Sequence, residues 1–138
     1  MSEAAKQEVE ADSGCFVCGP KNLIGLQADF TTDNSQGASY AVLQLSSDYQ
    51  GWKGVIHGGI IASLLDEACI YACRAKADRC VTAELQVRYR KPVPVEAQVV
   101  VTGRLEDCSR KVWQASAQLK IDDSLYAEAT AKVFVLDR

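Results

Sequence analysis

One long segment of helical character, Ile60 to Ala77, constrains the fold of this chain more than any other feature. The segment contains no proline, and apolar residues lie around most of its circumference. These residues are Ile60, Ile61, Ala62, Leu64, Leu65, Ala68, Ile70 and Ala72. A helix that is apolar nearly all round must be enclosed by the rest of the fold. The remainder of the chain therefore has to supply a layer that surrounds it.

Alternating apolar and polar residues after this helix predict four strands. The apolar positions are Val81, Ala83, Leu85, Val87 and Tyr89; Val99, Val101 and Leu105; Trp113, Ala115, Ala117, Leu119 and Ile121; and Leu125, Ala127, Ala129, Ala131, Val133 and Val135. In the first strand, Thr82, Glu84, Gln86, Arg88 and Arg90 are expected on the opposite, wetter face. Strands with one dry face are typical of an antiparallel sheet that is covered on one side.

Two more strands are predicted before the helix, at Leu26–Phe30 and Tyr40–Ser46, with a turn at Asp33–Gly37 between them. The expected order is therefore β-β-α-β-β-β-β. This is an α+β fold in which a long antiparallel sheet wraps around one central helix. Exposed sheet edges are commonly paired between subunits, so we expect a homodimer, with a dimer of dimers as the larger assembly.

The 138 residues fit one domain, which we place at 14–138 after a flexible tail at 1–13. The net charge of -3 and the pI of about 5.1 argue against nucleic acid or a membrane surface as a partner. No run of 18 apolar residues is present, and the N-terminus lacks the apolar core of a signal peptide. We therefore expect a cytoplasmic protein.

Six cysteines are expected to be reduced thiols in that compartment. Cys69 and Cys73 are interpreted as small buried apolar residues. Cys15 and Cys18 form one Cys-x-x-Cys pair, but a structural zinc site needs four ligands and no second pair has this spacing. The sequence therefore predicts no metal and no cofactor. An all-thiolate site pooled by two chains across a two-fold axis is the alternative.

Gly58 and Gly59 stand where the helix begins, after the lone histidine, His57. The first amides of a helix have no internal partner, and glycine lets a substrate approach them closely. Such amides can stabilise the oxyanion formed in acyl transfer. Simple loop closure is the alternative for the glycines. His57 could polarise a carbonyl or only orient the loop.

Asp66 lies about two turns into the helix, with no cation three or four residues away. A carboxylate on an apolar helix is costly to bury unless it is paired or reaches water. Desolvation would make it a stronger base, which suits general-base catalysis. A position at a helix rim or dimer interface is the alternative. Glu67 points about 100° away, toward a face where Ser63, Tyr71 and Arg74 allow solvation or ion pairing.

The segment from Gly54 to Ala68 contains His57-Gly58-Gly59, followed nine positions after the histidine by Asp66. This pattern resembles the signature of hotdog-fold thioesterases, most closely the PaaI-like and aromatic acyl-CoA thioesterase branch. The opening Cys15-Phe16-Val17-Cys18-Gly19, with Asn22 and Gly25-Leu26, resembles a bacterial subgroup of these proteins. The resemblance covers about residues 15–136.

The resemblance implies that Asp66 acts as general base or nucleophile and that the Gly58 N–H polarises the thioester carbonyl. It also implies that Thr82 positions water, and that the site lies between two subunits. Many relatives carry Asn or Gln six residues before the histidine, where this chain has Gly51. The adjacent Gln50 is the candidate substitute.

The implied substrate is an acyl-CoA or aroyl-CoA, whose phosphates require cations. The candidates are Arg88, Arg90 and Lys91 near a strand end, and Arg110 and Lys111 in a later turn; a solvated face is the alternative. Gly59, Trp52, Ile61 and Leu65 are the candidates for contact with the acyl part. A non-catalytic acyl-CoA binding domain and an enoyl-CoA hydratase or dehydratase are the competing functions.

Overall fold

The computed structural model describes residues 10–137. The elements follow in the order β1 (Thr31–Asp33), β2 (Ala38–Gln44), the 3-10 helix η1 (Ser47–Tyr49), α2 (Gly58–Arg74), β3 (Arg79–Tyr89), β4 (Gln98–Asp107), β5 (Val112–Ile121) and β6 (Ser124–Asp137). The predicted order of strands and helix is confirmed. Within the described residues, the strands form one antiparallel sheet in the order β1-β2-β4-β5-β6-β3.

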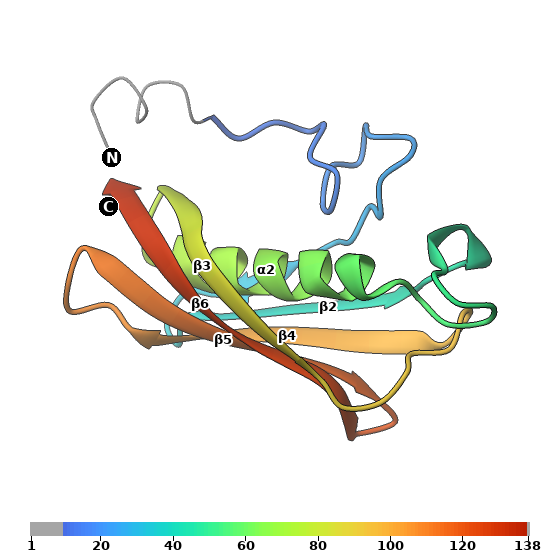
Figure 1. The fold of residues 1–138 in the computed structure, drawn as a ribbon. Coiled ribbons are helices and arrows are strands. Elements are labelled where there is room, and N and C mark those ends of the chain that lie inside the picture. The colour runs from blue at the N-terminus through green and yellow to red at the C-terminus, as the bar shows by residue number, and fades with distance from the viewer. Residues whose placement is uncertain (1–9, 138) are drawn as a thin grey trace.

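The long helix α2 lies across one face of this twisted sheet (Figure 1). Its buried residues are Ile61, Leu64, Leu65, Ala68, Cys69, Ala72 and Cys73. They pack against the alternate inward residues of β4, β5 and β6, among them Val99, Val101, Trp113, Leu119, Ala127 and Val133. The sheet thus covers the buried side of the apolar helix, in keeping with the predicted fold. Burial also raises the pKa values of the Cys69 and Cys73 thiols to about 12, in keeping with a packing role.

The chain before β1 departs from the prediction of a strand at Leu26–Phe30. The backbone of this segment bonds to the N-terminal turn instead of the sheet: Leu26 N–H donates to the Phe16 carbonyl at 2.9 Å and Ala28 N–H donates to Val17 at 2.8 Å. Gln27 has a φ of 51°, which interrupts an extended run. The first sheet strand is consequently the short β1. The segment from residue 10 to residue 30 covers α2 on the side away from the sheet (Figure 1).

Strand β3 also departs from simple alternation. The pairing with β6 shifts between Thr82 and Glu84, so Ala83 is the extra residue of a β-bulge. Without the bulge, strict alternation would place the side chains of Thr82 and Glu84 on the same, wetter face of the sheet. Because the bulge resets the alternation, Thr82 shares the helix-facing side with Leu85, and Ala83 is exposed. The prediction that Thr82 points away from the helix side was wrong for this reason.

The helix approaches the sheet most closely at Gly103 of β4. A Cβ atom placed on Gly103 would lie only 2.1 Å from the backbone oxygen of Ala68 in α2. The same oxygen accepts a hydrogen bond of 2.7 Å from the buried Ser39 hydroxyl of β2. Glycine therefore sets how closely α2 can pack, and Ser39 satisfies the carbonyl exposed at that contact. No helix in the described region is long and apolar enough to cross a bilayer.

Replacing Gly103 with alanine should lower the free energy of unfolding by about 1–3 kcal/mol, because the methyl group forces α2 away from the sheet. Urea unfolding followed by circular dichroism measures the loss. The neighbouring exposed Arg104 provides the control, since Arg104→Ala should change stability by less than about 0.5 kcal/mol. Equal stability of the Gly103→Ala variant and the wild type would contradict the close contact.

Candidate active site

The loop before α2 is held in place by its own backbone. The Gly51 N–H donates to the Val55 carbonyl at 2.8 Å, and the His57 N–H donates to Tyr49 at 2.9 Å. The Gln50 side-chain carbonyl accepts a 3.1 Å bond from the Gly54 N–H. Gln50, predicted as a substitute polariser, therefore serves to hold this loop.

His57 caps the N-terminus of α2. Its Nδ1 accepts a hydrogen bond of 2.8 Å from the Gly59 N–H, and its carbonyl accepts from Ile60 and Ile61. Tyr89 of β3 donates its hydroxyl to the Gly58 carbonyl at 2.8 Å. No acceptor for the Gly58 N–H is found within residues 10–137. The Gly58 amide is thus the helix donor left for a ligand, and His57 orients it.

A cleft of about 440 Å³ opens at this end of the helix. Its lining residues are Trp52, Val55, Ile56, Gly58, Ile61, Tyr89, Arg90, Lys91, Pro92, Val93 and Ala127. The structure therefore brings together predicted site residues from two segments that are distant in sequence, namely Trp52, Gly58 and Ile61 from the first and Arg90 and Lys91 from the second. A smaller cavity of about 390 Å³ adjoins His57 and the exposed Trp52. The larger cleft has an apolar floor, and Arg90 and Lys91 stand at its rim. This combination suits a ligand that is partly apolar and negatively charged.

Asp66 and Thr82 meet on the flank of α2 that faces β3. The Thr82 hydroxyl donates to Asp66 Oδ1 at 2.5 Å, and both residues are half-buried. The β-bulge at Ala83 makes this contact, because it turns Thr82 toward the helix. Asp66 has no other protein donor within the described residues, which leaves Oδ2 to accept from water.

The donor amide and the carboxylate lie apart within one chain. Gly58 and Asp66 are separated by eight residues, which corresponds to about 12 Å along a helix. Gly58 lies beside Tyr89 at one end of β3, whereas Asp66 lies beside Thr82 near the other end. A single thioester carbonyl therefore cannot reach both groups of the same chain.

The other predicted residues fall into different surroundings. Leu65 is fully buried in the core and offers no surface to a ligand in this chain. Arg88 is exposed and shares a shallow cavity with Arg90, whose guanidinium pairs with Glu128 at 2.7 Å. Gly59 is exposed at the helix start.

Arg110 and Lys111 lie in the turn before β5. Phe134 of β6 pairs with both Val112 and Val81, so this turn is near the Val81 end of β3. The cleft at Gly58 adjoins Tyr89, at the opposite end. Within one chain, these two cations therefore cannot serve the same ligand as Arg90 and Lys91.

Glu67 lies on a third face of α2, beneath the N-terminal turn. The Cys15 thiol donates to Glu67 Oε2 at 3.5 Å and the Cys18 thiol to Oε1 at 3.8 Å. Burial is the largest cause of a raised pKa at Glu67. The expectation of a solvated or ion-paired face is wrong here, because residues 10–20 cover it. The sequence pattern gave no signal for this contact or for the bond from Tyr89 to Gly58.

Comparison with solved structures identifies the fold as hotdog-like. A crystal structure of a thioesterase superfamily protein superposes with a TM-score of 0.81 at 25% identity, covering 89% of this chain and 60% of that one. A Streptococcus mutans protein bound to acetyl-CoA gives a TM-score of 0.75 at 19% identity, covering 80% and 90%. The E. coli PaaI protein gives 0.73 at 17%, covering 80% of each chain.

The family model of the thioesterase superfamily matches residues 53–128. The match takes in more than half of the sequence, and the chain belongs to this superfamily. Acyl-coenzyme A thioesterase THEM4 of Mus musculus is 28% identical over 138 residues, covering 99% of this chain and 60% of that protein. The Bos taurus THEM4 is 27% identical over 134 residues, covering 96% and 55%. The chain thus spans less than two thirds of the length of these relatives.

The hydrogen bond between Thr82 and Asp66 predicts how two substitutions at Thr82 change the free energy of unfolding. Thr82→Val removes the donor from a half-buried carboxylate and should lower the free energy of unfolding at pH 7 by about 1–3 kcal/mol. Thr82→Ser keeps the hydroxyl and should lose clearly less. Urea unfolding of the two variants measures the difference, and a larger loss in Thr82→Ser than in Thr82→Val would show that the methyl group, rather than the hydrogen bond, matters at this position.

Proposed function

We propose that this protein is a thioester hydrolase that cleaves acyl-CoA, within the PaaI-like branch of the superfamily. The observation that carries the proposal is the half-buried Asp66, held by the Thr82 hydroxyl on the helix whose first turn presents the Gly58 amide. Relatives named as acyl-CoA thioesterases and a structural neighbour with bound acetyl-CoA support the substrate class.

The proposed site is assembled from two chains. Strand β3 ends the strand order, so its outer edge is open to a copy of itself. Antiparallel pairing of two β3 strands brings the Tyr89 end of one chain to the Thr82 end of the other. The Gly58 amide of one subunit then approaches Asp66 of its partner, which removes the separation of about 12 Å within a chain.

In the proposed reaction, a water molecule held by Asp66 Oδ2 attacks the thioester carbonyl carbon. Asp66 accepts the proton from that water, while the Gly58 N–H of the other subunit donates to the carbonyl oxygen as it becomes an oxyanion. Collapse of the intermediate breaks the carbon–sulfur bond and releases CoA as a thiolate. The proton held by Asp66 then returns to the products, a free acid and CoA. Thr82 keeps the carboxylate oriented throughout.

The cleft beside Gly58 supplies a place for the CoA moiety. Arg90 and Lys91 stand at its rim, where they can pair with phosphate groups. The apolar surface of Ile61 and the exposed ring of Trp52 line the same cleft. We place the acyl chain along this apolar surface. Arg90 already pairs with Glu128, so phosphate would compete for an arginine that is held in position.

A non-catalytic acyl-CoA binding domain is the second candidate, and one feature favours it. Gly51 has no side chain with which to polarise the carbonyl, and Gln50 next to it is bonded to the Gly54 N–H. A Cβ on Gly51 would lie 3.3 Å from His57, so little room exists there for a larger residue. This candidate predicts binding of acyl-CoA without release of CoA.

Asp66→Asn should reduce the turnover of acyl-CoA at least about a hundredfold, because the amide cannot accept the proton from water. Thiol release from a panel of acyl- and aroyl-CoA substrates, followed with a thiol-reactive dye, measures the rate. Glu106→Gln removes an exposed carboxylate from β4, away from the proposed β3 interface, and is the control, with turnover expected near that of the wild type.

Undiminished turnover of the Asp66→Asn variant would overturn the proposed mechanism. Binding of acyl-CoA by the wild type with no hydrolysis across the panel would favour the non-catalytic domain. Product analysis with an enoyl-CoA separates both from hydratase activity, since hydration leaves the thioester intact.

A further inference from the structure

The N-terminal turn from Cys15 to Gly19 is built tightly enough to fix both of its cysteines. The Gly19 N–H donates to the Cys15 carbonyl at 2.8 Å. A Cβ on Gly19 would lie 2.4 Å from the Cys15 nitrogen and from the Ser13 oxygen, so only glycine fits. The tight turn therefore holds the sulfur atoms of Cys15 and Cys18 close together.

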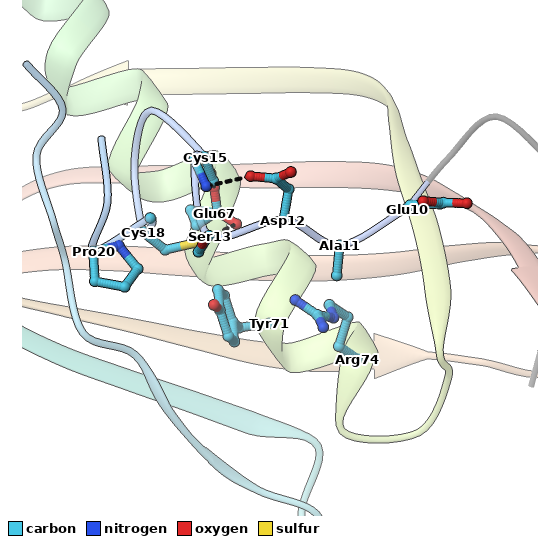
Figure 2. Close-up of a pocket in the computed structure, with 12 residues that line it drawn as sticks. Glu10, Ala11, Asp12, Ser13, Cys15, Cys18, Pro20, Glu67, Tyr71 and Arg74 are labelled. Carbon is cyan, nitrogen blue, oxygen red and sulfur yellow. Dashed lines mark hydrogen bonds between the residues drawn. The ribbon is translucent and has the colours of Figure 1, made fainter. Parts of the chain in front are cut away.

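Both sulfur atoms face the carboxylate of Glu67 on α2. Cys15 Sγ lies 3.5 Å from Oε2 and Cys18 Sγ lies 3.8 Å from Oε1. The three side chains offer ligand atoms that all lie within 4.8 Å of one another, and each is half-buried. Figure 2 shows them grouped where the N-terminal segment crosses the helix. Two segments 49 residues apart in sequence thus converge on one point.

The sulfur–oxygen distances in this cluster are close to those of a zinc site. A tetrahedral zinc ion bonds sulfur at about 2.3 Å and carboxylate oxygen at about 2.0–2.2 Å, which separates a bound sulfur from a bound oxygen by about 3.6 Å. The distance from Cys15 Sγ to Oε2 is 3.5 Å and that from Cys18 Sγ to Oε1 is 3.8 Å, on either side of this value. A pair of thiolates is also the ligand type that selects Zn²⁺ over Mg²⁺ or Ca²⁺.

Two aromatic side chains, Tyr71 and Phe30, and the side chain of Arg74 lie beside the cluster. The phenol of Tyr71 is hydrogen-bonded to Cys18 and stacks on Phe30 with ring centroids 5.1 Å apart. The Arg74 guanidinium lies over the Tyr71 ring, 5.2 Å from its centroid, and Figure 2 shows the two side chains near each other on α2. Outer hydrogen bonds of this kind orient the ligands of a metal ion and tune its binding.

We propose that Cys15, Cys18 and Glu67 bind a zinc ion that fastens the N-terminal segment onto α2. Zinc binding converts each thiol to a thiolate and releases one proton per sulfur, with no change of oxidation state. Water from the adjoining cavity of about 680 Å³ takes the fourth position. The cavity is lined mostly by residues 10–20, so the ion would hold the segment that covers the helix. The site lies on a different face of α2 from Asp66.

Metal analysis of the full chain tests the proposal without reference to activity. The protein is purified with a phosphine reductant, incubated with zinc sulfate, passed through gel filtration and analysed by elemental mass spectrometry. We expect about one zinc ion per chain, and a cobalt(II) form with thiolate charge-transfer absorption. Removing the metal with a chelator should lower the Tm by about 5 °C or more, because the ion binds only the folded state.

Substitution of each proposed ligand tests where the zinc ion binds. Cys15→Ser and Cys18→Ser should lose the zinc, and Glu67→Gln should weaken zinc binding at least tenfold in a competition titration. Tyr71→Phe should weaken it by about 10–100-fold if the phenol supports the thiolate. The exposed Cys108 provides the control, since Cys108→Ser should keep the metal.

Three outcomes would overturn the proposal. The first is a wild-type protein that carries no zinc after gel filtration although its thiols titrate as reduced. The second is a Cys15–Cys18 disulfide that forms in place of metal binding. The third is equal zinc content in the Glu67→Gln and Cys18→Ser variants and the wild type. Since Glu67→Gln leaves both cysteines in place, it keeps the test decisive if a cysteine variant fails to fold.

Discussion

The structure depends on how closely the apolar helix α2 can lie on its sheet. Gly103 permits the contact with the Ala68 carbonyl, and the Ser39 hydroxyl satisfies that carbonyl where water is excluded. The close approach fixes the helix in depth and rotation, so every side chain on α2 points in a determined direction. This packing contact sets the helix that carries Gly58 and Asp66, and the bonds from Tyr89 and Thr82 then fix each residue locally.

Asp66 and Glu67 are neighbours on α2 but lie in different surroundings, because successive helical residues point about 100° apart. Asp66 faces the edge strand β3 and is held by Thr82. Glu67 faces the N-terminal turn and meets Cys15 and Cys18. Asp66 therefore lies toward the strand edge where we propose that a second subunit binds. Glu67 is covered by the chain's own N-terminal segment.

Most of the fold could be predicted from the sequence, because hydrophobic periodicity reports which face each element buries. The motif singled out Asp66, which the structure places beside Thr82, whereas Leu65, predicted to contact a ligand, lies fully buried in the core. The bulge at Ala83 broke the alternation that had placed Thr82 on the wetter face. The approach of Cys15 to Glu67 depends on tertiary packing, which local spacing cannot show. Helix, sheet and order were therefore predictable, while the partners of individual polar groups were not.

Complementation between two inactive variants tests whether the site is shared by two chains. Gly58→Pro removes the amide hydrogen at the first helical position, where proline is tolerated, and His57 before it already has the extended backbone that proline requires. Gly58→Pro and Asp66→Asn are each expected to be inactive alone, while Gly58→Ala keeps the amide and activity. In mixed dimers, a shared site leaves one intact pair, so acyl-CoA hydrolysis should return to up to about half of wild type per mixed dimer. Mixed dimers that form but stay inactive would rule out a site in which Gly58 of one chain acts with Asp66 of the other.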